Sequence, residues 1–311
     1  MKEGINQMKK IKFIILLLGV FILTGCSFSK DSMEDINIYT TNYPIKYLIT
    51  SLYGSHSTVN SIYPSGINSK DFELSDKKLK EYSYTDLFVF NSLDKDRDFA
   101  VKMINYNKNL KVIDVSMGMT YDNNIAELWL NPYNYLMMAQ NTKNGLLEYV
   151  TNPYLISNDE GTGIENKYNE LKYNLSRLDA NIKEAISLAP YKTIVVDNDM
   201  FKYLEKYNLK VISLEEDDNL NENIVAEVKK LIRNGEIKYI FSSSNKTNPT
   251  CKNLVDNYGV DLITINTMES TDGGITDSNE DYITIMNNNL DLLNKELYKY
   301  VNILEYHDGT Y

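Results

Sequence analysis

Few side chains in this 311-residue chain carry a thiol or an imidazole, the groups that bind transition metals through sulfur or nitrogen. The chain has two cysteines, Cys26 and Cys251, and two histidines, His56 and His307. Apolar residues follow Cys251 at helical spacing, which is typical of a small buried side chain rather than a reactive thiol. The sequence has no nucleophile–base–acid set, no phosphate-binding loop and no Gly-x-Ser-x-Gly motif. We therefore predict that the protein is not an enzyme.

Cys26 ends a segment with the pattern of an export signal. Lysines precede the apolar run Phe13–Leu23, and small residues follow it. The ending Leu23-Thr24-Gly25-Cys26 resembles a bacterial lipobox, which implies removal of residues 1–25 and acylation of Cys26. A single transmembrane anchor is the alternative, but this run is shorter than the ~20 residues that span a bilayer. We expect a protein that is lipid-anchored to the outer face of the bacterial cytoplasmic membrane, with residues 26–35 as a tether.

The chain is acidic, and removal of the export signal makes it more so. The whole sequence has a net charge of −11, and without residues 1–25 it keeps 28 basic and 42 acidic residues, a net charge of −14. Such a charge repels nucleic acid and anionic membrane surfaces. Nucleic acid is therefore not expected as a partner, and the lipid on Cys26 has to hold the protein at the membrane. With Cys26 acylated, Cys251 has no cysteine to pair with, so no intramolecular disulfide is expected.

Short strand-like segments alternate with helical patterns, which is typical of parallel sheets flanked by helices. Apolar residues recur every three or four positions from Ile164 to Leu188, which predicts one long helix, with a coiled-coil partner helix as the alternative. We predict an α/β protein with an N-terminal lobe over 36–163, a rigid linking helix over 164–189 and a C-terminal lobe over 190–311. Asp277 is expected to cap the last helix. The predicted strands are 36–40, 59–63, 86–91, 110–114, 193–197, 209–214, 237–241 and 260–265.

This organisation suggests where a ligand would bind. In open α/β sheets, ligands bind beyond the carboxyl ends of the strands, and two such lobes can face one another across a cleft. An exported and tethered protein with two lobes is therefore expected to capture a solute.

Four stretches carry a resemblance to a known family. They are Pro64–Ser75, which begins Pro-Ser-Gly; Ala126–Pro132, which contains Trp-Leu-Asn-Pro; Asn198–Leu209, which begins Asn-Asp-Met-Phe; and Tyr282–Leu290. Their order and spacing resemble the metal-type solute-binding proteins of ABC transporters, the zinc and manganese receptors, over about residues 36–305. The resemblance implies a monomer that captures solute between two lobes and delivers it to an ABC permease and ATPase complex.

The chain departs from that family where the family binds its metal. The positions that match the metal ligands are Lys70, Glu127, Asn198 and, with a less certain alignment, Asn266, so no imidazole remains. Zinc favours histidine and cysteine ligands, and a protonated lysine has no lone pair to offer a metal. We predict that Lys70 and Glu127 form an ion pair in place of the metal, with the two asparagines satisfying the remaining hydrogen bonds. Four unrelated substitutions after loss of function are the alternative.

Oxygen ligands could still hold a metal, and Glu127 is the best remaining candidate. Mg²⁺, Ca²⁺ and Mn²⁺ tolerate carboxylates. Asp71, Glu73, Asp199 and the loop 272–277 also supply them, but the first three match positions that are not ligands in the family. No resident cofactor is expected, and a divalent metal enters only as cargo. The predicted function is a substrate-binding lipoprotein of an ABC transporter with lost or altered metal binding; the alternative is a non-transport surface lipoprotein derived from the same family.

Overall fold

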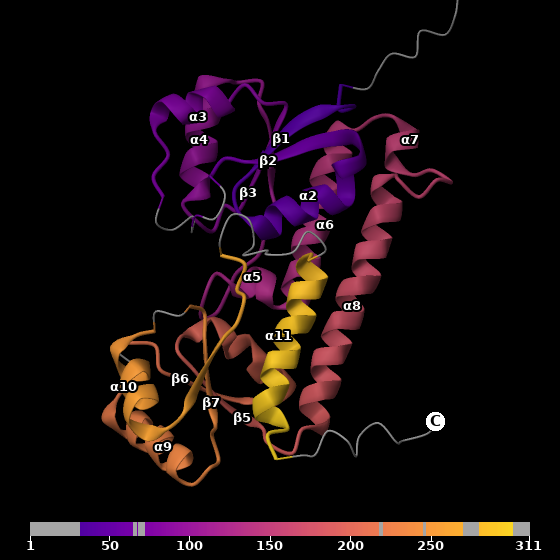
Figure 1. The fold of residues 1–311 in the computed structure, drawn as a ribbon. Coiled ribbons are helices and arrows are strands. Elements are labelled where there is room, and N and C mark those ends of the chain that lie inside the picture. The colour runs from indigo at the N-terminus through magenta and orange to yellow at the C-terminus, as the bar shows by residue number, and fades with distance from the viewer. Residues whose placement is uncertain are drawn as a thin grey trace, which may run out of the picture.

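The structure is a computed structural model, which describes residues 32–64, 67, 72–217, 220–244, 247–269 and 280–300. Figure 1 shows two lobes, one above the other, with one long helix beside both of them. Each lobe contains a four-stranded sheet in which neighbouring strands are parallel. This arrangement matches the two-lobed α/β fold expected from the alternating pattern.

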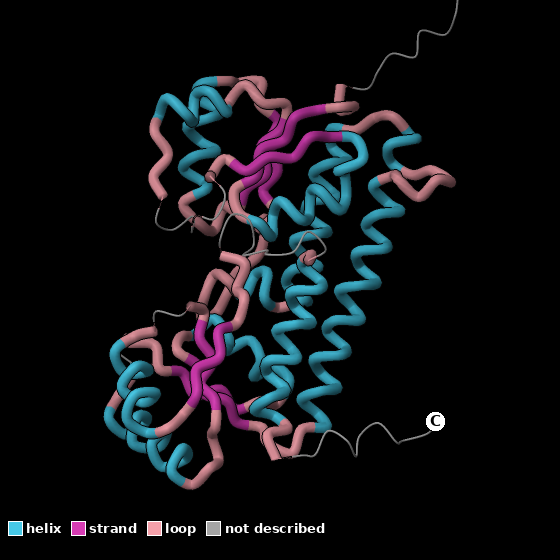
Figure 2. The backbone as a smooth tube through the Cα atoms, in the orientation of Figure 1, coloured by secondary structure: helices cyan, strands magenta, loops and turns pink. Residues whose placement is uncertain are grey.

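The sheet of the N-terminal lobe has the strand order β2-β1-β3-β4. All four residues of β3 are buried, as expected for a central strand that is covered on both faces. Helices cover both faces of the sheet (Figure 2). The elements in chain order are β1 (Ile36–Thr40), α2 (Tyr43–Tyr53), η1 (Gly54–His56), β2 (Ser57–Ser61), α3 (Asp76–Tyr82), β3 (Leu87–Phe90), α4 (Asp96–Tyr106), β4 (Lys111–Asp114), α5 (Glu127–Leu130), α6 (Pro132–Tyr149) and α7 (Pro153–Ile156).

The C-terminal lobe repeats this topology with the strand order β6-β5-β7-β8. In both lobes the second strand pairs on one side of the first, and the third strand pairs on the other side, so the chain reverses its direction of winding between the two central strands. The elements are β5 (Thr193–Val196), η3 (Asp199–Tyr207), β6 (Lys210–Ser213), α9 (Glu222–Arg233), β7 (Tyr239–Ser242), α10 (Pro249–Tyr258), β8 (Asp261–Thr264) and α11 (Tyr282–Leu297).

The long helix α8 (Ile164–Leu188) connects the lobes and ends where the sequence predicted. At ~1.5 Å per residue its 25 residues extend about 37 Å. Gly163 caps its first turn, and a Cβ atom at that position would lie 2.6 Å from the Cα atom of Ser157, so only glycine fits there. No helix among the described residues combines the length and the apolar character that a membrane crossing requires. The buried positions of α8 are Ile164, Tyr168, Leu171, Leu175, Leu178, Ile182 and Ile186.

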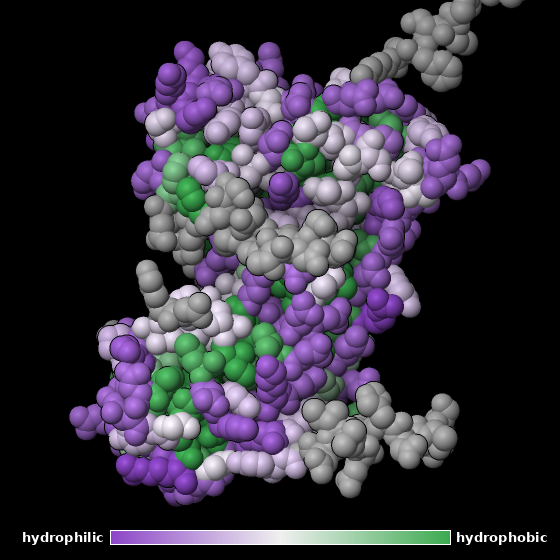
Figure 3. All heavy atoms as spheres, viewed as in Figure 1, coloured by the Kyte–Doolittle hydropathy of each residue, from purple (hydrophilic) through white to green (hydrophobic). Residues whose placement is uncertain are grey.

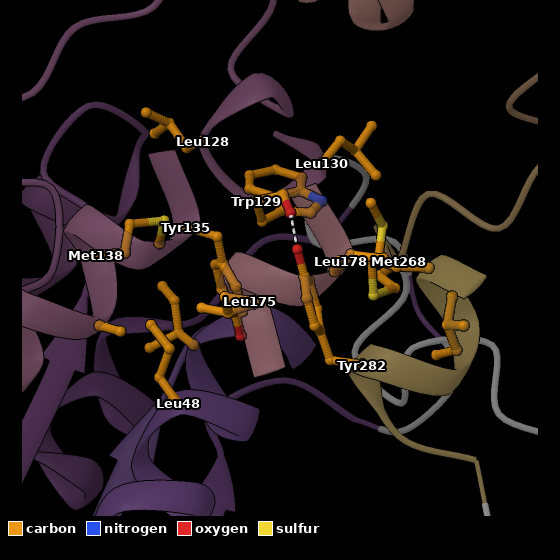
Figure 4. Packing of buried hydrophobic residues seen from close by; sticks show 14 of the residues in the cluster. Leu48, Leu128, Trp129, Leu130, Tyr135, Met138, Leu175, Leu178, Met268 and Tyr282 are labelled. Carbon is orange, nitrogen blue, oxygen red and sulfur yellow. Dashed lines mark hydrogen bonds between the residues drawn. The ribbon is translucent and has the colours of Figure 1, made fainter. Parts of the chain in front are cut away.

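One apolar core passes through both lobes along α8. Two smaller clusters lie on the far faces of the sheets, under α3 and α4 in one lobe and under α9 and α10 in the other. Where the lobes meet, the rings of Tyr135 and Tyr282 stack with centroids 4.1 Å apart. The hydroxyl of Tyr282 donates to the backbone oxygen of Trp129 at 2.6 Å (Figure 4). The two lobes therefore share one packed interior.

Local predictions differ from the structure at two places. The strand predicted over 59–63 is β2 at Ser57–Ser61, because the apolar Ile62 and Tyr63 follow the strand and pack into the core instead. The cap of the last helix is Asp281, whose side chain accepts from the backbone nitrogen of Thr284 at 2.8 Å, and not Asp277, which lies outside the described residues.

Candidate functional site

Polar residues follow the central strands of both sheets. Thr41 comes after β1 and Asn91 after β3, while Asp197 and Asn198 come after β5 and Ser242 ends β7. Because parallel strands end at the same edge, each set lies at the carboxyl edge of its sheet. These edges are turned toward the other lobe in Figure 1, and the surface is hollowed between the lobes on the left of Figure 3. The region between the lobes is therefore the candidate site.

Glu127, the first residue of α5, is only 4% exposed. Its Oε2 atom accepts from the backbone nitrogen of Asp122 at 3.2 Å, and its Oε1 atom accepts from Nδ2 of Asn123 at 2.9 Å. The carboxylate thus holds the loop that precedes α5. A carboxylate accepts about four hydrogen bonds, so part of its capacity is still open. Glu127 also lines a hollow of about 520 Å³, together with Asn131 and Lys206 from either side of the lobe junction.

The amide of Asn198 is engaged within the C-terminal lobe. Its Oδ1 atom caps η3 by accepting from the backbone nitrogen of Met200 at 3.0 Å. Its Nδ2 atom donates to Oδ1 of Asp197 at 2.6 Å and to Oγ of Ser243 at 3.1 Å. A ligand that coordinated Asn198 would therefore compete with these three contacts.

Asn266 is held against α11. Its backbone nitrogen donates to Oδ1 of Asn289 at 3.1 Å, and its backbone oxygen accepts from Nδ2 of Asn289 at 2.8 Å. Its side-chain Oδ1 accepts from the backbone nitrogen of Met268 at 2.9 Å, which closes a short turn. Asn266 therefore has a clear structural role at the end of β8.

The same turn presents Glu269, which the sequence analysis did not single out. The indole nitrogen of Trp129 donates to the backbone oxygen of Thr267 at 2.8 Å, so this segment is tied to the helix that begins with Glu127. The hydroxyl of Thr267 donates to Oε2 of Glu269 at 3.3 Å. Between them, the buried Met268 has a φ of 56°, which is rare for a residue with a side chain and is often found at functional sites. The sequence holds no local signal for Glu269, because the contact that brings this turn to Trp129 joins residues 138 positions apart.

Each sheet edge also contains one buried carboxyl group. Burial raises the pKa of Asp96 to about 7, although the nearby Thr41 hydroxyl and the backbone of Asn91 oppose the rise. Burial likewise raises the pKa of Asp197 to about 6, against a hydrogen bond from Ser242. Both groups therefore change charge within two pH units of neutrality.

Several predicted residues lie outside the part of the chain that the structure describes. These are Lys70, Asp71, His307, the loop 272–277 and Cys26. The Lys70–Glu127 ion pair and the acylation of Cys26 consequently stay predictions. His56 ends the turn before β2, at the amino edge of the sheet and away from the candidate site.

Comparison with known proteins identifies the family. The model of the family "Zinc-uptake complex component A periplasmic" matches residues 38–296. The chain belongs to this zinc-uptake family. The predicted family and the two-lobed fold are therefore confirmed.

Among individual members, the zinc-binding lipoprotein AdcA of Streptococcus pneumoniae is 24% identical over 92% of this chain. This chain spans 60% of the length of AdcA. The metal ABC transporter substrate-binding lipoprotein ScbA of Streptococcus cristatus is 26% identical over 76% of this chain and 83% of its own length. The crystal structure of the Zn(II)-bound ZnuA-like domain of S. pneumoniae AdcA covers 85% of this chain and 99% of that domain, with 22% identity and a TM-score of 0.66.

The described residues of this family member contain no group of three or more histidine, cysteine, aspartate or glutamate side chains that could hold a metal ion. The donors present around the lobe junction are carboxylate and amide oxygens, from Glu127, Glu269, Asn198 and Asn266. Such donors suit hard cations better than zinc.

Proposed function

We propose that this protein is the substrate-binding lipoprotein of an ABC transporter, which captures its cargo between the two lobes and passes it to a permease and ATPase complex. The supporting observation is the family match over residues 38–296, together with two sheets whose polar carboxyl edges are turned toward one another. The protein acts by binding and not as an enzyme. Residues 1–25 are its export signal, and a lipid on Cys26 anchors the monomer to the outer face of the cytoplasmic membrane.

The cargo site of this receptor has lost zinc-type coordination. Lys70 supplies a positive charge where relatives have a histidine, and it pairs with Glu127, which lies buried at the lobe junction. In the alternative in which Lys70 does not pair with Glu127, a metal cargo would be held by oxygens of Glu127 and Glu269. Mn²⁺ or Ca²⁺ would then bind better than Zn²⁺.

Calorimetry on the metal-free full-length protein in detergent tests this proposal. Wild-type protein is expected to bind Zn²⁺ no tighter than micromolar, because no imidazole is available. The double substitution Lys70→His with Asn198→His should raise zinc affinity at least tenfold. Two histidines placed on exposed helices, Lys295→His with Asn253→His, should not change it. Submicromolar zinc binding by wild-type protein that is lost on Glu127→Ala would overturn the ion-pair proposal.

A surface lipoprotein without a transport role is the second candidate. It is favoured by the hydrogen bonds that already occupy Glu127, Asn198 and Asn266. Crosslinking in native membranes separates the two functions. A receptor should crosslink to a permease subunit, whereas a protein that acts only through its exterior should not.

A further inference from the structure

A second hollow at the lobe junction gathers positive charge on this acidic chain. Its volume is about 430 Å³, which lies within the ~300–1,000 Å³ typical of small-molecule sites. Its walls come from the start of α6, from α8 and from the end of η3. We call it the lysine groove, and the side chains that define it are Asn131, Tyr133, Asp179, Lys183, Lys192 and Lys206. Three ammonium groups thus face one carboxylate in a protein with a net charge of −11.

The single carboxylate of the groove is already compensated. Oδ1 of Asp179 accepts from Nζ of Lys206 at 3.0 Å and from the hydroxyl of Tyr207 at 2.6 Å. Lys206 also donates to Oδ1 of Asn131 at 2.6 Å, which joins the two lobes. Asp179 is therefore not available to neutralise the two other lysines.

Those two lysines keep most of their hydrogen-bonding capacity. Lys192 donates to the backbone oxygen of Ser187 at 2.9 Å, which uses one of its three N–H groups. The ammonium group of Lys183 makes no hydrogen bond or ion pair with any residue in the described ranges. The groove thus has a surplus positive charge with unused donors, which favours an anion.

An exposed aromatic ring forms one wall of the groove. Tyr133 is 62% exposed although it lies beside a hollow, and Nζ of Lys206 lies 5.9 Å from the centre of its ring. A flat apolar surface next to cationic donors fits an organic anion better than a bare inorganic ion, because the carbon body can cover the ring.

We propose that the lysine groove binds a small organic anion, with its carboxylate or phosphate group held by Lys183, Lys192 and Lys206 and its carbon body against Tyr133. The groove includes none of the positions 70, 127, 198 and 266, although Asn131 and Lys206 also line the hollow of Glu127. Because its walls come from both lobes, a bound anion bridges them.

Calorimetry on metal-free full-length protein in detergent tests the proposal with three probes: phthalate, inorganic phosphate and the uncharged benzamide. Phthalate carries two carboxylates on a flat ring and is expected to bind most tightly, phosphate weakly, and benzamide not at all. Lys183→Glu with Lys192→Glu should weaken phthalate binding at least tenfold. Lys172→Glu with Lys295→Glu changes the net charge equally at exposed positions and should weaken it less than twofold.

The variant Tyr133→Ala distinguishes the contribution of the aromatic ring to anion binding from the contribution of the lysines. It should weaken phthalate binding severalfold and leave phosphate binding unchanged. Failure of both anions to bind wild-type protein at millimolar concentration would overturn the proposal. An equal loss of affinity in the two charge-reversal variants would also overturn it, because the general field of the protein would then explain binding.

Discussion

The two lobes share one strand order but satisfy their buried carboxyl groups in different ways. In the C-terminal lobe, Asp197 accepts from Ser242 and Asn198, so each of its two oxygens has a side-chain partner. In the N-terminal lobe, the hydroxyl groups of Thr41 and Tyr63 are buried near Asp96, and neither makes a hydrogen bond of normal geometry with the residues that the structure describes. The surroundings of the two buried carboxyl groups thus differ, although the C-terminal edge also contains a buried oxygen, Oδ1 of Asp199, without a hydrogen-bond partner among the described residues.

The C-terminal lobe has a further saturated carboxylate at the opposite end of its sheet. Glu296 accepts from the backbone nitrogens of Lys238 and Tyr239 at 3.1 and 2.9 Å, and from Nζ of Lys299 at 2.7 Å. Both side chains of the ion pair are fully buried, and the Lys299 ammonium lies 3.8 Å from the centre of the Tyr191 ring. Removal of either partner of this buried ion pair should therefore lower the free energy of unfolding considerably.

Removal of Lys299 should give the largest effect. Lys299→Met leaves the Glu296 carboxylate buried without its partner and should lower the free energy of unfolding by about 3–5 kcal/mol. Urea denaturation measures the change. The matched substitution Lys295→Met on the exposed face of α11 should change stability by less than about 0.5 kcal/mol. Equal losses in both variants would show that the buried pair has no special role.

The pH dependence of stability should give the second largest effect, and it should differ between the buried carboxyl groups of the two lobes. A carboxyl group whose pKa is raised in the folded state contributes most below its unfolded pKa, and this contribution is lost as pH rises through the folded pKa. For Asp96 the window runs from about 4 to about 7. Asp96→Asn should therefore gain stability relative to wild type between pH 5 and pH 7, by on the order of 1 kcal/mol per pH unit. Thermal unfolding at both pH values provides the measurement.

Asp197→Asn is the control for that series. Its window ends near pH 6, and the new amide cannot accept as Asp197 does from both Ser242 and Asn198. Asp197→Asn should therefore be less stable than wild type at pH 5, whereas Asp96→Asn should have nearly the stability of wild type at that pH. Identical profiles for the two variants would contradict the difference between the edges.

Two small substitutions test the unused hydrogen bonds directly. Ser242→Ala removes a donor to the buried Asp197 and should cost about 1–3 kcal/mol. Thr41→Val removes a hydroxyl that makes no hydrogen bond of normal geometry with the described residues, while the shape of the side chain is kept, and should change stability by less than about 0.5 kcal/mol. Chemical denaturation at pH 5 compares them. A large loss for Thr41→Val would mean that this hydroxyl is bonded after all.

The sequence predicts the fold well because the signals are local. The seven buried positions of α8 repeat every three or four residues, and the buried run of β3 is apolar throughout, so short windows are sufficient. The prediction of the cap of α11 was wrong because Asp277 and Asp281 are both suitable N-cap residues. The sequence alone does not show which of them directly precedes the first turn of the helix.

The candidate site was predicted less completely because its geometry depends on distant contacts. The bond from Trp129 to Thr267 joins residues 138 positions apart, and it brings the turn with Glu269 to the helix of Glu127. No periodicity encodes such a contact. The prediction therefore selected Asn266, whose amide closes the turn, and passed over the carboxylate three residues later.

The shared apolar interior has a consequence for how cargo enters and leaves. Swinging the two halves apart like jaws would wet this interior, at about 2.5 kcal/mol for every 100 Å² of apolar surface exposed. The bond between Tyr282 and Trp129 would break as well. If cargo binds between the lobes as proposed, we therefore expect loading and release to involve rearrangement of surface loops while the shared core stays packed.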